Sequence, residues 1–410
     1  APSWVSRTIS IDDIPNLLSL LPDTGGIAWV SGEPGYHIGV VGWGQVDDFT
    51  ISGTESFSQA QRWWDNWCRT SEGDSPVAFA SFAFSPNETS TLIIPEVLIR
   101  RTALGTTLTV TAPAQTIDHT LASTRAHLTN FSPSPSGVPL ISWAEGTRTV
   151  SEWATRVDEA ITRINRGEVD KVVLARDIFA HSDSPIHLGA LLGRLNLAFP
   201  ECWTFCVDGI IGATPELLVR RNEHEVTSRV LAGTVRRSSN SDRDGQLAAA
   251  LLGSDKDQEE HAYAVESVAA ALAQHCVDLD VPENPFVLQL ANVQHLATDI
   301  TGELAQSTPV LTLAASLHPT AAVCGTPTER AKSLIKELEG MERGRYAGPV
   351  GWIDADGNGE IGIALRCAEV NTERNTLRLF AGCGIVAGST SDAEVAESQS
   401  KFAAMRDALI

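Results

Sequence analysis

The sequence predicts an α+β fold, and two observations support this class. Short strand-like segments follow one another in pairs, as in hairpins, and the helical segments occur in groups instead of alternating with the strands. The chain has 410 residues, of which 43% are hydrophobic, so it can form one large globular domain or two modest ones.

Short strands dominate the first 130 residues. Runs of β-branched and aromatic residues, punctuated by glycine, predict strands at 25–32 and 39–44, and strand character returns at 77–84 and 90–100. A helix is predicted around 59–67. The segment 130–139 contains three prolines and three serines and is therefore predicted to be a loop.

A helix is predicted after this loop. Apolar residues three or four positions apart predict it over 151–167, with Ser151 as the N-cap and Gly167 at its end. A buried strand is predicted directly afterwards, at 171–176. Further strands are predicted at 203–211, 217–219, 347–353, 360–370 and 376–381, and further helices at 255–273, at 327–338 and from about 392 onwards.

Composition narrows the class of protein. The formal net charge of −21 argues against a nucleic-acid binder, because phosphate contacts require clustered Lys and Arg. No apolar stretch approaches the roughly 20 residues that span a bilayer, and no signal peptide is evident, so we expect a cytoplasmic protein without a membrane partner. The seven scattered cysteines are expected to be reduced thiols.

Two predicted helices carry carboxylates on one face. Glu394, Glu397 and Lys401 are spaced by three and four residues, and Asp257, Glu260 and His261 have similar spacing. Each triplet alone is more typical of a solvated helix face. If the two helices converged, however, their carboxylates would suit Mg²⁺ better than Zn²⁺, which prefers His and Cys ligands.

Other candidate residues are individually weak. The glycine-rich turn 381–388 would let backbone N–H groups approach a ligand. Lys171 opens an apolar strand, where burial could lower its pKa into the range of a general base, although a lysine at a strand edge is the more common explanation. Glu216 follows a proline, and Tyr346 and Arg366 could hold a carboxylate.

The order of nine short motifs is more informative than any one of them. They are Lys-Val-Val-Leu-Ala-Arg (171–176), Thr-Pro-Glu (214–216), Ala-Gly-Thr (232–234), Lys-Asp-x-x-Glu-His (256–261), His-Leu-x-Thr-x-Ile-x-Gly (295–302), Leu-His-Pro-Thr-x-Ala-Val-Cys-Gly-Thr-Pro (317–327), Arg-Gly-x-Tyr-Ala-Gly-Pro-Val-Gly (343–351), Ala-Leu-Arg-Cys-Ala (364–368) and Ala-Gly-x-Gly-Ile-Val-x-Gly-Ser (381–389). In this order they resemble the chorismate-utilising enzymes, which include the anthranilate synthase component I-like proteins.

The resemblance implies a fold of large antiparallel sheets packed together with helices outside. It also implies one site. Magnesium would be held by Glu260 and Glu397, with Asp257 and Glu394 in supporting positions. Lys171 and Glu216 would be the catalytic base and acid. The substrate-binding residues implied are Gly233, Thr234, His295, Ala322, Tyr346, Arg366, Gly382, Gly384 and Lys401.

Three positions favour one reaction of the family. Members that use ammonia usually carry Gln in place of Lys171, and aminodeoxychorismate synthases carry a nucleophilic Lys in place of Ala232. Members that eliminate pyruvate tend to carry Thr in place of Ala322. The resemblance therefore implies the isomerisation of chorismate to isochorismate. Salicylate formation, an ammonia-dependent synthase and a non-catalytic chorismate-binding module are the alternatives.

The resemblance is close over 145–410 and weak over 1–140. We expect both parts to form one chorismate-binding α+β domain, 1–410. We also expect a monomer that needs no amidotransferase subunit, because water would be the nucleophile.

Overall fold

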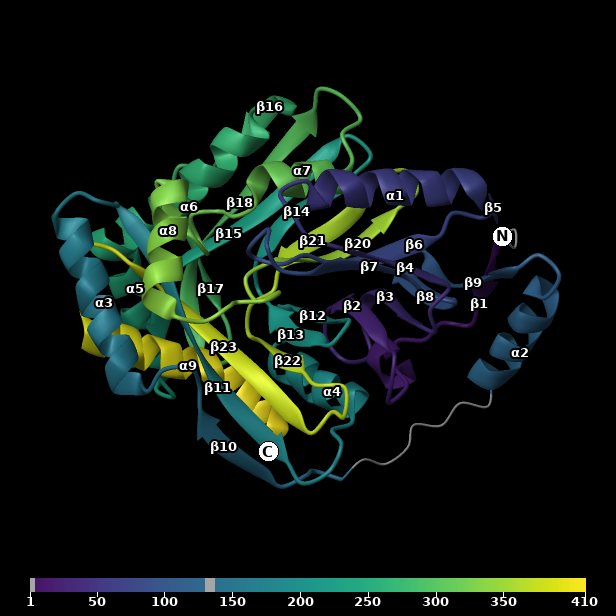
Figure 1. The fold of residues 1–410 in the computed structure, drawn as a ribbon, viewed down its shortest axis with the longest axis horizontal. Helices are drawn as coiled ribbons and strands as arrows, with labels where there is room; N and C mark the ends of the chain where they lie inside the picture. Colours follow the sequence, from purple (N-terminus) through teal and green to yellow (C-terminus); the bar gives the residue numbers. More distant parts are fainter. Residues whose placement is uncertain (1–3, 130–136) are drawn as a thin grey trace.

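Two large, almost entirely antiparallel sheets dominate the fold (Figure 1). The computed structural model describes residues 4–129 and 137–410. In the first sheet the strands lie in the order β10 (Ile141–Glu145), β11 (Lys171–Ser182), β23 (Thr376–Ile385), β22 (Cys367–Val370), β13 (Ile210–Thr214), β12 (Trp203–Val207), β2 (Ile27–Ser31), β3 (Ile38–Trp43), β8 (Val97–Thr102), β9 (Gly105–Pro113), β1 (Trp4–Ile11) and β5 (Glu72–Gly73), with β19 (Gly325–Thr326) beside β11.

The second sheet lies against the first. Its order is β16 (Cys276–Asp280), β18 (Val293–Leu304), β15 (Glu225–Arg236), β14 (Leu217–Asn222), β21 (Gly359–Ile363), β20 (Pro349–Asp354), β6 (Val77–Ser81), β7 (Ser90–Ile94) and β4 (Asp47–Ile51), with β17 (Phe286–Gln289) beside β18. The described helices are η1 (Leu17–Leu20), α1 (Ser56–Thr70), α2 (Ile117–Thr129), α3 (Val150–Asn165), α4 (Leu188–Ala198), α5 (Ser241–Leu252), α6 (Asp255–Leu272), α7 (Val310–Leu317), α8 (Thr328–Glu339) and α9 (Ser391–Leu409). The predicted α+β class is confirmed.

Each sheet joins a block of strands from the N-terminal part of the chain to a block of strands from the C-terminal part. β2 pairs with β12 in the first sheet, and β6 pairs with β20 in the second. Backbone hydrogen bonds therefore tie the segment before the predicted loop at 130–139 to the segment after it. Of that loop, residues 130–136 lie outside the described part of the chain. The division of the sequence at 140–145 stays a prediction.

Two apolar clusters hold the layers together. One contains buried aromatic side chains of both sheets, such as Trp29, Phe205 and Phe79, and Trp29 also donates a 2.7 Å hydrogen bond to Glu360 of the other sheet. The second cluster lies on the other face of the first sheet, where Leu192 of α4 and Met405 of α9 are buried. The helix α9 therefore packs on the first sheet, whereas α6 packs on β15 and β18 of the second sheet.

Two predicted strands are each broken into two. The predicted strand 203–211 is the hairpin β12–β13, because Asp208 and Gly209 take φ angles of 48° and 80° in a two-residue turn. The predicted strand 360–370 is interrupted at Arg366, whose φ is 48°. The long central strands β15 and β18 and the helix α4 were not predicted.

The predicted cap of α3 was wrong by two residues. Thr149, and not Ser151, accepts a hydrogen bond from the backbone N–H of Glu152 at 3.2 Å. The carboxylate of Glu152 in turn accepts from the backbone N–H of Thr149 at 2.8 Å, which completes a capping box. The Thr-x-x-Glu spacing is the signal that identifies this start.

We predict that Thr149→Ala lowers the free energy of unfolding by about 1 kcal/mol, because the N-terminus of α3 loses its cap. Urea unfolding of the full chain measures this change. Ser151→Ala is the matched control and should change the stability by less than about 0.5 kcal/mol. Equal effects of the two substitutions would contradict the assignment.

Candidate functional site

One cavity between the two sheets collects most of the predicted site residues. Those that line it are Glu216, Gly233, Thr234, Glu260, His295, Ala322, Tyr346, Arg366, Gly382, Gly384 and Lys401. The other four, Lys171, Asp257, Glu394 and Glu397, come from the adjoining strand β11 and helices α6 and α9. The fold therefore brings together segments that are up to 230 residues apart in the printed sequence.

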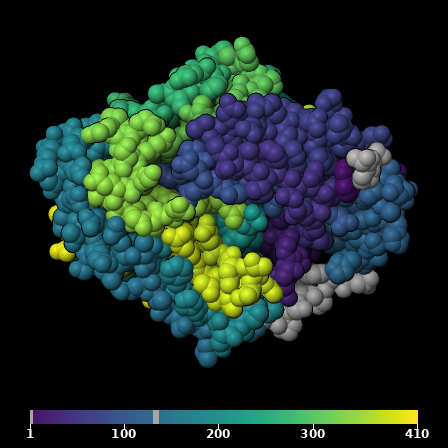
Figure 2. Space-filling model, in the orientation of Figure 1, coloured from purple at the N-terminus to yellow at the C-terminus, as the bar shows by residue number. Residues whose placement is uncertain are grey.

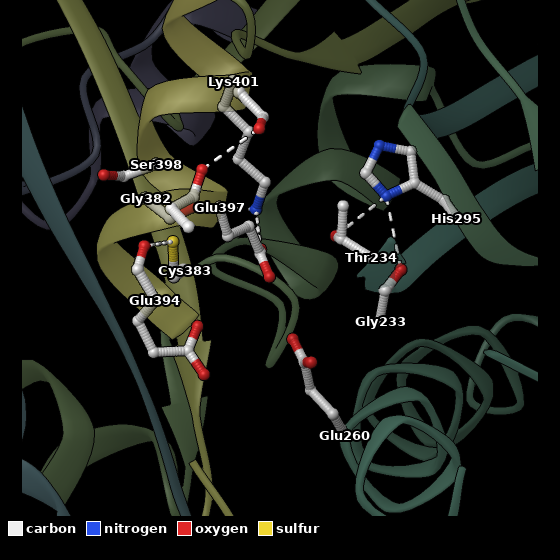
Figure 3. Close-up of polar contacts among 12 residues, drawn as sticks. Gly233, Thr234, Glu260, His295, Gly382, Cys383, Glu394, Glu397, Ser398 and Lys401 are labelled. Carbon is white, nitrogen blue, oxygen red and sulfur yellow. Dashed lines mark hydrogen bonds and ion pairs between the residues drawn. The ribbon is translucent and has the colours of Figure 1, made fainter. Parts of the chain in front are cut away.

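Carboxylates of two helices face each other at one end of the cavity. Glu394 and Glu397 project from α9 and Glu260 projects toward them from α6 (Figure 3). Lysines balance this charge: Lys401 Nζ lies 2.6 Å from Glu397 Oε1, and Lys256 Nζ lies 3.0 Å from Glu394 Oε1. The predicted convergence of the two helices on one site is therefore present in the fold.

The carboxylates perturb one another strongly. Burial, followed by the charge of Glu397, raises the pKa of Glu394 to about 7. Burial also raises the pKa of Glu260, although Lys171 opposes this shift. Burial acts in the same direction on Glu397, but the ammonium of Lys401 outweighs it and the pKa of Glu397 is lowered. Glu397 is therefore the carboxylate most firmly held in its ionised form.

This donor set fits a divalent cation with oxygen ligands. The side chain of Glu394 is 1% exposed, and its Oε2 atom has no hydrogen-bond partner among the described residues. Unpaired buried carboxylate oxygens are the donors that Mg²⁺ takes up. Asp257, the fourth predicted carboxylate, packs against Gly233 at the start of α6. His261 does not join the group, because it contacts Ala232 and Thr298 in the second sheet.

Glu216 has the properties of a general acid. It follows β13 and its side chain is buried at the cavity wall. Burial raises the pKa of Glu216 to about 8, against the charge of Lys171. The carboxyl group is therefore protonated near pH 7, where an ordinary glutamate would be ionised. A buried, protonated carboxyl group at a cavity wall is a proton donor.

Lys171 begins β11 and is fully buried, not exposed at a strand edge. Its amine donates to the backbone carbonyl of Glu260 at 3.3 Å and lies 3.5 Å from the carboxylate of the same residue. Burial lowers the pKa of Lys171, although Glu260 opposes the shift. The amine lies directly behind the cavity lining, because a Cβ added to Gly384 would be 3.0 Å from Lys171 Cε.

Arg366 is oriented by a neutral histidine. Its guanidinium lies 2.8 Å from His295 Nε2, and since a guanidinium can only donate, Nε2 accepts. Burial, with the charge of Arg366, keeps the pKa of His295 well below its usual value. His295 Nδ1 then carries the proton, which faces Gly233 O at 3.3 Å and Thr234 Oγ1 at 3.1 Å. Arg366 therefore presents a fixed positive charge to the cavity.

Glycines allow the backbone to approach these groups. Gly233 forms a β-bulge in β15 with a φ of 79°, which interrupts the register between β15 and β18 beside the cavity. On β23, a Cβ at Gly382 would stand 2.7 Å from the Tyr346 hydroxyl, and one at Gly384 would stand 2.1 Å from Glu260 Oε1. Only glycine leaves room for both side chains.

Sequence reasoning missed an ion pair that supports the cavity. Arg343 and Glu339 are both buried, and the same carboxylate accepts from the backbone N–H of Ala175 at 2.7 Å. Arg343 also donates to the carbonyls of Val173 and Val323, two residues that line the cavity. The Arg-Gly-x-Tyr motif contains Arg343, but the motif alone did not reveal that this side chain stabilises the cavity wall.

Comparison with known proteins places the whole chain in one family. A family model described as chorismate binding enzyme matches residues 2–410. Isochorismate synthase DhbC of Bacillus subtilis is 41% identical over 270 residues, which is 63% of this chain and 67% of the relative. Isochorismate synthase MenF of the same organism is 30% identical and covers 92% of this chain and 86% of the relative.

Solved structures agree with this relationship. The menaquinone-specific isochorismate synthase MenF of Escherichia coli superposes with a TM-score of 0.83 at 28% identity, covering 100% of this chain and 95% of that chain. Anthranilate synthase component I of Streptococcus pneumoniae has a TM-score of 0.68 at 19% identity over 99% and 92% of the two chains, a likeness of fold alone. Among the described residues, no helix is long and apolar enough to cross a membrane.

We predict that Gly384→Ala weakens Mg²⁺ binding by about 10–100-fold, because the added methyl group displaces the Glu260 carboxylate. Titration calorimetry of the purified chain measures the affinity. Gly388→Ala is the matched control, since its nearest neighbour would be an ordinary contact at 3.5 Å with Lys256. Unchanged affinity in Gly384→Ala would contradict the placement of Glu260.

Proposed function

The chain belongs to the chorismate-binding enzymes, and on this premise we propose that it is an isochorismate synthase that isomerises chorismate to isochorismate. The observation that carries the proposal is a pair of groups with shifted pKa values, Glu216 at the cavity wall and Lys171 directly behind the cavity lining. Glu216 is a carboxylic acid that keeps its proton near neutral pH, and Lys171 is a buried amine that gives up its proton more readily than usual.

The reaction adds water at C2 of chorismate and removes the C4 hydroxyl as water. Glu216 donates its proton to the departing hydroxyl, because hydroxide alone is a poor leaving group. Lys171 accepts a proton from the water that attacks C2. Two such positioned groups each contribute typically about 10²–10⁴-fold to the rate. Neither step consumes ammonia, so an amidotransferase subunit has no role in this mechanism.

The remaining residues would bind the ring and the two carboxylates of the substrate. Arg366, Tyr346 and the backbone at Gly382 and Gly384 suit the carboxylate of the enolpyruvyl arm. Gly233, Thr234 and Ala322 face the ring. Glu260 and Glu397 would hold Mg²⁺, with Asp257 and Glu394 in support. The ion, when bound, supplies a positive charge that anchors and polarises the ring carboxylate.

MenF of Escherichia coli is a menaquinone-specific isochorismate synthase, and another structural relative, DhbC of Bacillus anthracis, is described as a putative 2,3-dihydroxybenzoate-specific isochorismate synthase. Isochorismate made by this chain feeds menaquinone or siderophore biosynthesis. The expected setting is a cytoplasmic monomer. The principal alternative is salicylate synthesis, which has the same first step followed by loss of pyruvate. Ala322, in place of the threonine common in pyruvate-eliminating members, favours the product that keeps its enolpyruvyl arm.

We predict that the purified chain, given chorismate and Mg²⁺ without any amine, forms isochorismate and no pyruvate. Chromatography of the products measures this outcome, and EDTA should abolish turnover until Mg²⁺ is restored. Fluorescent salicylate with an equal amount of pyruvate would establish the alternative. No product with any nucleophile would indicate a binding module.

We predict that turnover falls as the pH rises through about 8, because Glu216 loses the proton that it must donate. Glu216→Gln should lower kcat by about 10²–10⁴-fold, and its residual activity should no longer fall near pH 8. The matched control is Glu225→Gln, a change at an exposed carboxylate in β15. An unchanged kcat in Glu216→Gln would exclude this residue as the acid.

A further inference from the structure

A cysteine thiol lies beside the carboxylates of α9. Cys383 stands between Gly382 and Gly384 on β23, and its side chain faces α9, where Sγ lies 3.3 Å from the backbone carbonyl of Glu394 (Figure 3). Sγ and one carboxylate oxygen from each of Glu394 and Glu397 all lie within 4.8 Å of one another. Among the described residues, no other His, Cys, Asp and Glu side chains form such a group.

Glu394, one member of this group, has a carboxylate oxygen that is unsatisfied within the described part of the chain. Its side chain is 1% exposed, and only one of its two oxygens is paired, with Lys256 at 3.0 Å. The other oxygen, Oε2, has no hydrogen-bond partner among the described residues. A buried carboxylate oxygen without a partner is unfavourable, and a cation in contact with it would remove that cost.

We propose that Cys383, Glu394 and Glu397 form a site for a thiophilic divalent cation such as Zn²⁺, Co²⁺ or Cd²⁺. Sulfur is a soft ligand that Mg²⁺ avoids and these ions prefer. Zinc binds sulfur at about 2.3 Å and carboxylate oxygen at about 2.0–2.2 Å, so the three ligand atoms need to approach to about 3.5 Å. On binding, the three side chains would rotate to this spacing, water would complete the tetrahedron, and the metal would replace the thiol proton.

An ion can reach this group from solvent. The side chains of Glu397 and Lys256, which adjoin it, are 17% and 28% exposed, whereas Cys383 and Glu394 are buried. Lys256 and Lys401 each pair with one carboxylate oxygen. They therefore hold the two carboxylates in place before an ion arrives.

The thiophilic site shares Glu397 with the proposed magnesium site, so the two ions should compete. This consequence rests on the proposed function, since it predicts that Zn²⁺ or Cd²⁺ inhibits turnover by removing a magnesium ligand. The existence of the site does not depend on that function, and a spectroscopic measurement tests it separately.

The direct test is titration of the purified full chain with Co²⁺, followed by the near-ultraviolet sulfur-to-cobalt charge-transfer band. The band should saturate at one ion per chain in the unmodified protein. Cys383→Ala should remove it, while Cys276→Ala, a change at a half-buried thiol in β16 at the edge of the second sheet, should keep it. A band that persists in Cys383→Ala, or no band in the unmodified chain, would overturn the proposal.

A second variant covers the case in which Cys383→Ala fails to fold. Glu394→Gln keeps the thiol and removes one ligand charge, so Cd²⁺ affinity should fall at least about tenfold. Unchanged Cd²⁺ affinity would count against the site. Added Mg²⁺ should suppress the cobalt band. A cobalt band that Mg²⁺ does not change would contradict the shared use of Glu397. Both readouts are independent of whether the chain converts chorismate.

Discussion

Buried opposite charges are the constraint on which the rest of the structure depends. Glu260 and Glu394 are buried and Glu397 is partly buried, and the three lie near Lys171, Lys256 and Lys401 on elements from three distant parts of the chain. A buried charge is tolerated only when partners compensate it, so β11, α6 and α9 must meet at fixed positions. The two-sheet framework meets this requirement, because α9 packs on the first sheet and α6 on the second (Figure 1).

The surface of the molecule shows how this arrangement is assembled (Figure 2). Segments from the beginning, middle and end of the sequence adjoin one another, as the mixed strand order of both sheets requires. The backbone departs from regular strand geometry where these segments meet at the cavity. The bulge at Gly233 and the left-handed conformation of Arg366 are local departures from regular strand geometry, and such departures persist where surrounding contacts hold them.

The same carboxylates explain both proposals about cations. Oxygen ligands of Glu260 and Glu397 suit a hard ion next to the substrate cavity, while the sulfur of Cys383 on the other face of β23 adds a soft ligand to the same group. The two glycines that flank Cys383 leave the cavity face of the strand free for Glu260 and Tyr346. The alternation of side chains along β23 thus directs Cys383 toward α9, while Gly382 and Gly384 line the cavity.

The sequence by itself determined the α+β class, the family and the set of residues that gather at the cavity. Contacts between residues close in the sequence can be predicted from spacing, as for Glu397 and Lys401, which lie one helical turn apart and form an ion pair. Even so, the hairpin turn at Asp208 was missed and the cap of α3 was placed at Ser151 instead of Thr149, although both carry short-range signals.

Only the tertiary structure decided which groups are buried and what they face. The protonated state of Glu216 depends on removal from water by both sheets, and the pairing of Lys256 with Glu394 spans 138 positions. The direction of the Cys383 side chain depends on how β23 meets α9. Desolvation and long-range pairing arise from contacts between distant segments, and no spacing along the chain encodes them.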